Sequence, residues 1–225
     1  MANEHEGHRK RLKERFRSEG LDSFESHNVL ELLLFYANPR SDTNVTAHKL
    51  MERFGSLDEV FDAAFEELCE VDGVGENAAT LLMMVPQLAR RYVTEKAALK
   101  NSADGSTDVG AYVLPRFLGL TEEKLMLVSL NNMGRIIACN VVAEGSIDSV
   151  SVSVRKIVET ALRTKANKVI IAHNHPHGFA VPSEEDISMT ISIKKALATV
   201  GIELVDHLIV AHDDYVSMLD SGILG

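Results

Sequence analysis

The feature that most constrains the fold is an abrupt change in hydrophobic pattern near the middle of the chain. Before residue 100, apolar residues recur at the three- and four-residue spacing of amphipathic helices. After residue 110, short apolar runs alternate with helical stretches. The segment between them, 101–110, is rich in Gly, Ser and Asp, which is typical of a linker or a long loop. We therefore expect two domains, residues 1–100 and 101–225.

The first part has the pattern of an all-α domain. Leu30, Leu33 and Leu34 fall on one helical face, and Pro39 ends that helix. Gly55 ends a second helix in the same way. Nothing in this part has the pattern of a strand. The helices predicted here are 30–37, 45–54, 57–68 and about 77–92.

The second part has the pattern of a mixed α/β domain. The apolar run 125–130 suits a buried strand, and 136–142 returns as its hairpin partner after a turn at 131–134. Strands interleaved with helices indicate a mixed α/β domain, and an α+β chain overall. The predicted strands are 125–130, 136–142, 168–172 and 202–210, and the predicted helices are 152–164 and 184–199.

Two histidines and an aspartate after the predicted strand 168–172 carry the most specific chemistry. His173 and His175 are two residues apart, so on a strand they face the same side while Asn174 faces away. Asp186 falls in the first turn of the next helix and can turn back towards them. Two imidazoles, one carboxylate and an open fourth position form the ligand set of a catalytic zinc.

The same segment has a second explanation that needs no metal. Ser183 and Asp186 have the spacing of a capping box at the start of the predicted helix. Either histidine, taken alone, could be a hydrogen-bonded core residue. The two explanations are compatible, because Ser183 can cap the helix while Asp186 binds a metal.

Composition narrows the classes of protein. The chain has 23 basic and 33 acidic residues and a net charge of -10, which argues against coating DNA by charge alone. Residues 1–17 differ, with six basic and three acidic side chains. No apolar run approaches the roughly 18–20 residues of a membrane helix, and the charged N-terminus lacks a secretory signal, so no membrane partner is expected. Cys69 and Cys139 form no CxxC pattern or disulfide framework, which favours the cytoplasm.

The order of the motifs resembles a known family. The spacing of His173, His175, Ser183 and Asp186 is similar to the JAMM (MPN+) metalloprotease signature, and the whole chain resembles the bacterial RadC (UPF0758) family. This implies an N-terminal helix-hairpin-helix module followed by a mixed α/β JAMM/MPN zinc domain with a cytidine-deaminase-like fold. The matching segments are Gly7–Phe16, Leu30–Leu34, Arg53–Leu57, Val71–Gly75, Leu130–Asn132, Ala172–Pro176 and Asp206–Val210.

The resemblance also assigns roles. His173, His175 and Asp186 would bind Zn²⁺, and Ser183 would help to stabilise the developing oxyanion. The family's catalytic glutamate starts the first strand of this domain, and counting back from 130–132 places it at Glu123.

Zinc would lower the pKa of a bound water to about 7, and Glu123 would move the proton of that water to a leaving amine. Glu122 and Glu144 are alternatives for this role. The alternative for Glu123 itself is an exposed carboxylate at a strand edge.

Two positions depart from the family pattern. His177 stands where the family usually has a serine, and we expect a surface residue there rather than a fourth polar group near the metal. The segment Ser153–Lys156 keeps only Arg155 of the family's His-Pro-Arg-Glu, which weakens any inference about a substrate group bound there.

The segment 71–75 matches the hairpin of a helix-hairpin-helix module. Gly73, Val74 and Gly75 would let backbone N–H groups approach a DNA phosphate, independently of base sequence. The alternative is an ordinary tight turn between packed helices. Asp72 and Glu76 oppose phosphate binding by their charge.

Basic side chains elsewhere would be needed for such a contact. Arg90, Arg91 and the basic residues of 9–17 would form a patch if the fold brought them together. The run 9–17 could equally be the solvated face of a helix.

These patterns predict a zinc-dependent hydrolase of JAMM type that cleaves a peptide or isopeptide bond in a peptide or protein substrate, with a DNA contact through the N-terminal module. The first alternative is a DNA-binding, repair-associated adaptor with an idle or structural zinc site. The second is a metal-dependent nuclease that uses the same ligands.

Overall fold

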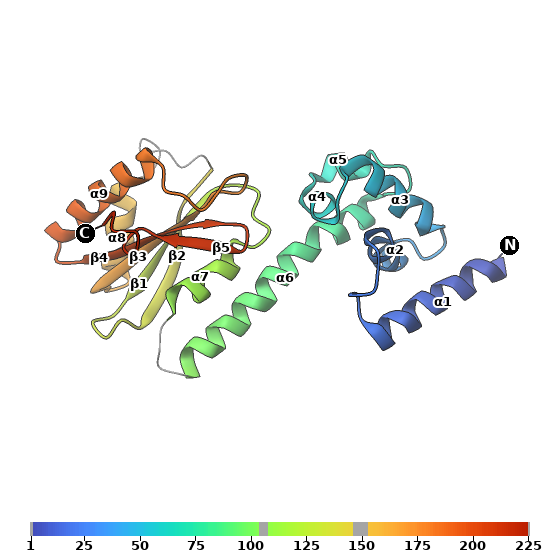
Figure 1. Cartoon of the computed structure of the whole chain (residues 1–225), viewed down its shortest axis with the longest axis horizontal. Coiled ribbons are helices and arrows are strands. Elements are labelled where there is room, and N and C mark those ends of the chain that lie inside the picture. The colour runs from blue at the N-terminus through green and yellow to red at the C-terminus, as the bar shows by residue number, and fades with distance from the viewer. Residues whose placement is uncertain (1, 104–107, 146–152, 225) are drawn as a thin grey trace. The chain divides into compact units, whose positions relative to one another are not determined.

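A computed structural model describes residues 2–103, 108–145 and 153–224 of the chain (Figure 1). The chain divides into two compact units, Met1–Leu88 and Ala89–Gly225. Helix α6, Glu76–Ala103, contributes residues to both. A domain boundary between residues 100 and 101 stays a prediction.

Every regular element described in the first unit is a helix, so the all-α prediction for this part is confirmed. Leu30, Leu34, Leu50, Leu68 and Leu82 are fully buried and form its core. Burial of these aliphatic side chains is the main stabilising contribution in a unit of this size. The helices that precede α6 are α1 (Ala2–Glu19), α2 (Ser26–Ala37), α3 (Thr43–Phe54), α4 (Leu57–Asp62) and α5 (Phe65–Cys69).

The single helix predicted over 57–68 is wrong, because the chain divides it into α4 and α5. Ala63 between them has an extended backbone, with φ −64° and ψ 147°. The side chain of Glu67 accepts a hydrogen bond from the Ala64 N–H at 3.0 Å, which satisfies a free donor at the start of α5. Val60 in α4 and Leu68 in α5 both reach the core.

The helix predicted to end near residue 92 continues to Ala103 as part of α6. Residues 93–103 contain neither Gly nor Pro, so nothing in the sequence stops the helix there. Asp108 then caps α7 (Val109–Phe117), accepting a hydrogen bond from the Ala111 N–H at 3.0 Å. The expected linker 101–110 is therefore helical at both ends, and its residues 104–107 lie outside the described residues.

The second unit contains a five-stranded sheet in the order β2-β1-β3-β4-β5. β1 pairs antiparallel with β2 and β3, β3 pairs parallel with β4, and β4 pairs antiparallel with β5. The strands are β1 (Lys124–Leu130), β2 (Ile136–Glu144), β3 (Lys168–Asn174), β4 (Glu203–Ala211) and β5 (Asp214–Ser217). α8 (Val154–Arg163) precedes β3, and α9 (Glu184–Thr199) connects β3 to β4.

Most elements of this unit were predicted. Residue 152, the expected start of α8, lies outside the described residues. β5 and α7 were not predicted. The α+β class, with a helical first part and a mixed sheet second, is confirmed. Within the described ranges, no helix combines the length and apolar character needed to cross a membrane.

Helices cover both faces of the sheet (Figure 1). Ile171 of β3 packs with Ile193 of α9 in one core, and Ile170 packs with Val113 of α7 in the other. Side chains alternate along a strand, so His173 shares the face of Ile171 and points towards α9. The fold therefore directs this histidine at the helix that carries Asp186.

Candidate metal centre

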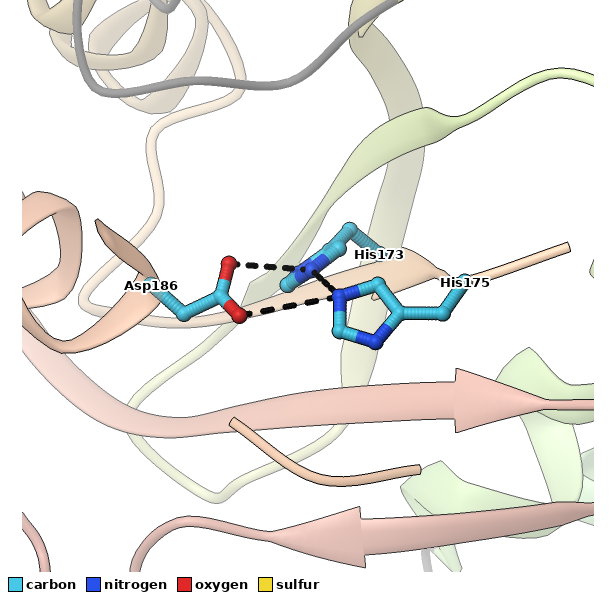
Figure 2. A group of neighbouring side chains, drawn as sticks. All are labelled: His173, His175 and Asp186. Carbon is cyan, nitrogen blue, oxygen red and sulfur yellow. Dashed lines mark hydrogen bonds and ion pairs between the residues drawn. The ribbon is translucent and has the colours of Figure 1, made fainter. Parts of the chain in front are cut away.

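Three side chains from the end of β3 and the start of α9 meet in one cluster. One ligand atom each from His173, His175 and Asp186 lies within 4.8 Å of the other two. His173 and Asp186 are only 1% and 2% exposed, while His175 is partly exposed. The predicted ligand set is thus brought together by the fold (Figure 2).

The ring nitrogens and the carboxylate face a common point. His173 Nε2 lies 3.1 Å from Asp186 Oδ1, and His175 Nε2 lies 3.6 Å from Asp186 Oδ2. The two Nε2 atoms are 2.8 Å apart. Figure 2 shows both rings turned towards the carboxylate.

A backbone carbonyl fixes which end of His175 faces the cluster. His175 Nδ1 lies 3.0 Å from the carbonyl oxygen of Phe179. A carbonyl oxygen can only accept, so the neutral ring carries its proton on Nδ1 and presents a lone pair at Nε2. A lone pair beside a buried carboxylate is unfavourable without a cation, so these residues fit a metal ion.

The pKa shifts of the cluster describe the alternative to a metal ion, in which protons on the ring nitrogens bridge to the carboxylate. Burial alone would raise the pKa of the Asp186 carboxyl, but hydrogen bonds from His173 and His175 outweigh it and hold that pKa far below its usual range. The hydrogen bond to Asp186 raises the pKa of His175, against the effect of burial. The negative charge of Glu123 adds to the same upward shift.

Ser183 forms the capping box that the sequence suggested. Its hydroxyl accepts a hydrogen bond from the Asp186 N–H at 3.1 Å, and Asp186 Oδ2 accepts from the Ser183 N–H at 2.8 Å. The Ser183 hydroxyl also lies 2.7 Å from Asp186 Oδ2, to which it donates. The helix cap and the candidate ligand are therefore the same pair of residues.

A pocket of about 440 Å³ opens beside the cluster. Glu123, the glutamate that the family resemblance implies, lies in its wall, and neither alternative glutamate does. Glu144 instead pairs with Lys124, with 3.1 Å between the carboxylate oxygen and Nζ. The lining residues are Thr121, Glu123, His175, Pro176, His177, Gly178, Ser183, Glu185 and Asp186.

Asn174 holds the segment that carries Glu123. Its side chain is 3% exposed and points away from the two histidines that flank it. Asn174 Oδ1 accepts from the Lys124 N–H at 2.7 Å, and Nδ2 donates to the carbonyl of Glu122 at 3.1 Å. These bonds attach the residues before and after Glu123 to the end of β3. Sequence reasoning placed Asn174 on the far face but gave it no role.

Sequence reasoning also missed His207 of β4. This residue is fully buried, and its Nε2 lies 2.8 Å from His173 Nδ1. Burial, followed by the nearby His173, lowers the pKa of His207 well below its usual range. Its position in the matched segment 206–210 was the available signal.

The two positions that depart from the family pattern lie on the surface. His177 is exposed and lines the pocket. Arg155 of α8 is exposed and pairs with Glu159, with 2.7 Å between Nε and Oε1.

The hairpin residues Gly73, Val74 and Gly75 lie between α5 and α6 of the first unit. The Val74 N–H donates to the carbonyl of Val71 at 2.9 Å, which closes a tight turn. Gly73 has φ +93°, and a Cβ at this position would lie 2.3 Å from Thr46 Oγ1. Glycine is therefore required here by backbone conformation and by packing.

Charged groups near the hairpin are largely paired. Asp72, expected to repel phosphate, forms an ion pair of 2.6 Å with Lys49 of α3. Arg9 donates to the carbonyls of Asn38, Pro39 and Ser41 and so binds the end of α2.

Arg90 and Arg91, the two arginines considered for a basic patch, are also engaged within the second unit. Arg90 donates to the carbonyl oxygen of Leu118 at 3.0 Å. Arg91 Nε lies 2.9 Å from Glu95 Oε1. These partners reduce the charge available to a phosphate.

Comparison with known proteins covers both units. Residues 103–223 match the RadC-like JAB domain, and residues 44–84 match a helix-hairpin-helix motif. Similar full-length relatives are UPF0758 proteins of Fusobacterium nucleatum (34% identical over 98% of both chains), Ruegeria pomeroyi (33% over 96% of this chain and 97% of the relative) and Clostridium botulinum (30% over 95% and 94%). The candidate metal ligands fall in the first match and the hairpin glycines in the second.

Proposed function

This chain belongs to the UPF0758 family with a RadC-like JAB domain, and from that premise we propose that it is a zinc-dependent hydrolase of JAMM type. The proposed reaction is cleavage of a peptide or isopeptide bond in the cytoplasm. One observation carries the proposal: ring nitrogens of two histidines and a buried carboxylate converge at a pocket that Glu123 also lines.

The donor set favours zinc over magnesium and calcium. Two imidazoles, one carboxylate and an open position are typical of catalytic zinc, whereas magnesium and calcium prefer oxygen ligands. Bound at His173, His175 and Asp186, zinc would supply a water of lowered pKa and polarise the substrate carbonyl. The pocket of about 440 Å³ on the open side leaves room for a substrate segment.

The remaining steps fall to side chains of the pocket. The Glu123 carboxylate would accept a proton from the attacking water and deliver it to the leaving amine. Asn174 would keep that carboxylate in place through Glu122 and Lys124. Ser183 would stabilise the oxyanion by turning its hydroxyl from Asp186 towards the substrate, where one such donor is worth about 3–4 kcal/mol.

The charge of the pocket alone does not choose between a peptide and a nucleic acid as substrate. Glu123, Glu185 and Asp186 line it, but a zinc ion bound at Asp186 would bring two positive charges to the same place. A nuclease assay with a chelator control separates the nuclease alternative from the peptide hydrolase.

The test combines metal analysis with hydrolysis assays on quenched linear peptides and isopeptide-linked conjugates. Glu123→Gln should keep bound zinc and lose at least about 100-fold in kcat, as expected for a lost general base. Glu185→Gln, which also removes a charge from the pocket wall, is the matched control and should retain most activity. Full activity of Glu123→Gln would refute the assigned role, and zinc binding without hydrolysis of any substrate would favour the adaptor alternative.

We propose, second, that the helix-hairpin-helix segment contacts DNA without sequence preference. The match of residues 44–84 to that motif supports this, as does the ion pair that neutralises Asp72 beside the glycines. Lys49 and Arg53 of α3 are candidate cations for this contact, and each is paired with an acidic residue of the 70–72 segment.

Fluorescence titration of a labelled duplex at low and moderate salt tests the contact. The double variant Lys49→Ala/Arg53→Ala should weaken binding and flatten its salt dependence. Arg155→Ala, an exposed arginine of the second unit, should not. Absence of binding by the wild-type chain at low salt would refute this proposal and leave the hydrolase untouched.

A further inference from the structure

A buried hydrogen-bond chain connects two of the candidate metal ligands behind the cluster. His173 Nδ1 lies 2.8 Å from His207 Nε2, and His207 Nδ1 lies 2.6 Å from Thr190 Oγ1. Thr190 Oγ1 in turn lies 2.5 Å from the backbone carbonyl of Asp186. The chain therefore begins at one ligand and ends at the main chain of another.

The register of the sheet and the pitch of α9 explain why these hydrogen-bonding groups lie next to one another. Parallel pairing of β3 and β4 sets Ile171 opposite His207, so His207 lies on the same face as His173. Asp186 and Thr190 are four residues apart on α9 and therefore share its buried face. Both features place the polar groups in the layer between the sheet and α9.

The donor and acceptor of each hydrogen bond in this series follow from its last member, the backbone carbonyl of Asp186. The carbonyl of Asp186 can only accept, so the single hydroxyl proton of Thr190 points to it. Thr190 Oγ1 must then accept from His207, which places the His207 proton on Nδ1.

The position of the proton on His173 follows in the same way. A neutral His207 with its proton on Nδ1 has a lone pair on Nε2, and it accepts the Nδ1 proton of His173. A second proton on His207 would place a charge at a site that is fully buried, which is costly. His173 is left with its lone pair on Nε2, aimed at His175 and Asp186.

We propose that His207 is a positioning residue of the metal centre, which with Thr190 fixes the tautomer and the orientation of His173. The inference rests on the proposed function only in taking the cluster for a metal site. It assigns a role to the matched segment 206–210 that its sequence alone does not suggest. Outer partners of this kind typically change metal affinity by about 10- to 100-fold.

The neighbouring Asp206 has a different task, which makes the assignment specific. Its Oδ2 accepts from Ser217 Oγ at 2.6 Å, and its Oδ1 accepts from the Leu219 N–H at 2.9 Å. Asp206 thus attaches the C-terminal segment to β4. Of the two polar residues in this segment, His207 is the one that contacts a candidate ligand.

Two matched pairs of variants test the inference by zinc affinity, measured in competition with a chromophoric chelator. Thr190→Val keeps the shape of the side chain but removes the acceptor for His207, and it should weaken zinc binding about 10- to 100-fold. Thr190→Ser keeps the hydroxyl and should bind zinc as the wild type does. His207→Gln can still present an acceptor to His173, whereas His207→Asn cannot reach it and should lose affinity.

Nitrogen NMR of histidine-labelled wild-type protein with zinc gives a readout that a merely structural role would not move. Both His173 and His207 should carry their protons on Nδ1. A proton on Nε2 of His207, or equal zinc affinity of Thr190→Val and Thr190→Ser, would overturn the inference. If Thr190→Val does not fold, the comparison of His207→Gln with His207→Asn and the NMR assignment still test the inference.

The outcomes also separate this inference from the proposed function. Zinc binding that depends on Thr190 and His207, without hydrolysis of any peptide, supports the inference and removes the hydrolase. Peptide hydrolysis by the wild type, with zinc affinity unchanged in Thr190→Val and His207→Asn, supports the hydrolase and removes the inference. A wild-type chain that binds no zinc overturns both.

Discussion

Replacing Asn174 with alanine should impair the proposed general base, Glu123, without impairing the proposed metal ligands. The Asn174 side chain is buried at the end of β3 and bonds to the main chain of Glu122 and Lys124, at 3.1 and 2.7 Å. It points away from the metal cluster, although His173 and His175 flank it in sequence. Its removal should therefore disturb the position of Glu123 and leave the ligands in place.

The expected magnitude follows from those two bonds. Each contributes about 1 kcal/mol net, and the deprived N–H and carbonyl add a desolvation cost, so a loss of about 2–4 kcal/mol in the free energy of unfolding is expected. For catalysis, a shift of about 1 Å in a reacting group commonly costs about 100-fold in rate. The kcat of Asn174→Ala should fall by that order once zinc is bound.

Three measurements on one preparation decide the matter. Urea unfolding gives the stability loss, chelator competition gives the zinc affinity, and peptide hydrolysis gives kcat. Asn132→Ala, at an exposed position in the turn between β1 and β2, is the control and should change none of them. Zinc affinity falling in parallel with kcat, or wild-type kcat in Asn174→Ala, would refute the assignment of Asn174 to the glutamate.

Three further predictions concern the ligands and the hairpin. Asp186→Ala should abolish stoichiometric zinc in metal analysis, because the cluster loses its carboxylate; full retention of zinc would remove Asp186 as a ligand. In zinc-free protein, the raised pKa of His175 means that its stabilising contribution is complete below about 6.5 and is lost as pH rises through the folded-state pKa. The difference in unfolding free energy between wild type and His175→Gln should therefore shrink as the pH rises above about 6.5, and a difference that grows instead would contradict the sign. Gly73→Ala should cost about 1–3 kcal/mol through its positive φ and the contact with Thr46, while Gly75→Ala, with no heavy atom within 4 Å of the added Cβ, should cost less in the same thermal unfolding assay.

Local patterns in the sequence predicted the cluster because local geometry creates it. Alternation along β3 places His173 and His175 on one side, and the first turn of α9 brings Asp186 back. The partners His207 and Asn174 could not be assigned in the same way. Their contacts join residues 34 and 50 positions apart, and such pairings depend on sheet register rather than on spacing.

The missed elements have a similar explanation. α7 contains Gly110 and Pro115, which are typical of a loop, and it forms because Asp108 caps it and its apolar face packs on the sheet. β5 has only four residues and pairs at the edge of the sheet with the end of β4. In both cases tertiary packing outweighs local propensity.

The spacing of Ser183 and Asp186 is constrained twice. Helix geometry places the side chain of the third helical residue next to the N-cap, so the reciprocal bonds require these two residues to be three positions apart. The proposed metal centre requires a carboxylate in that same first turn, facing the end of β3. Asp186 meets both demands with different oxygens, because Oδ2 accepts from Ser183 while Oδ1 faces His173. The folding of α9 therefore holds the carboxylate in place before any metal arrives, and it follows that this serine–aspartate spacing points to a metal only when a pair of histidines faces it.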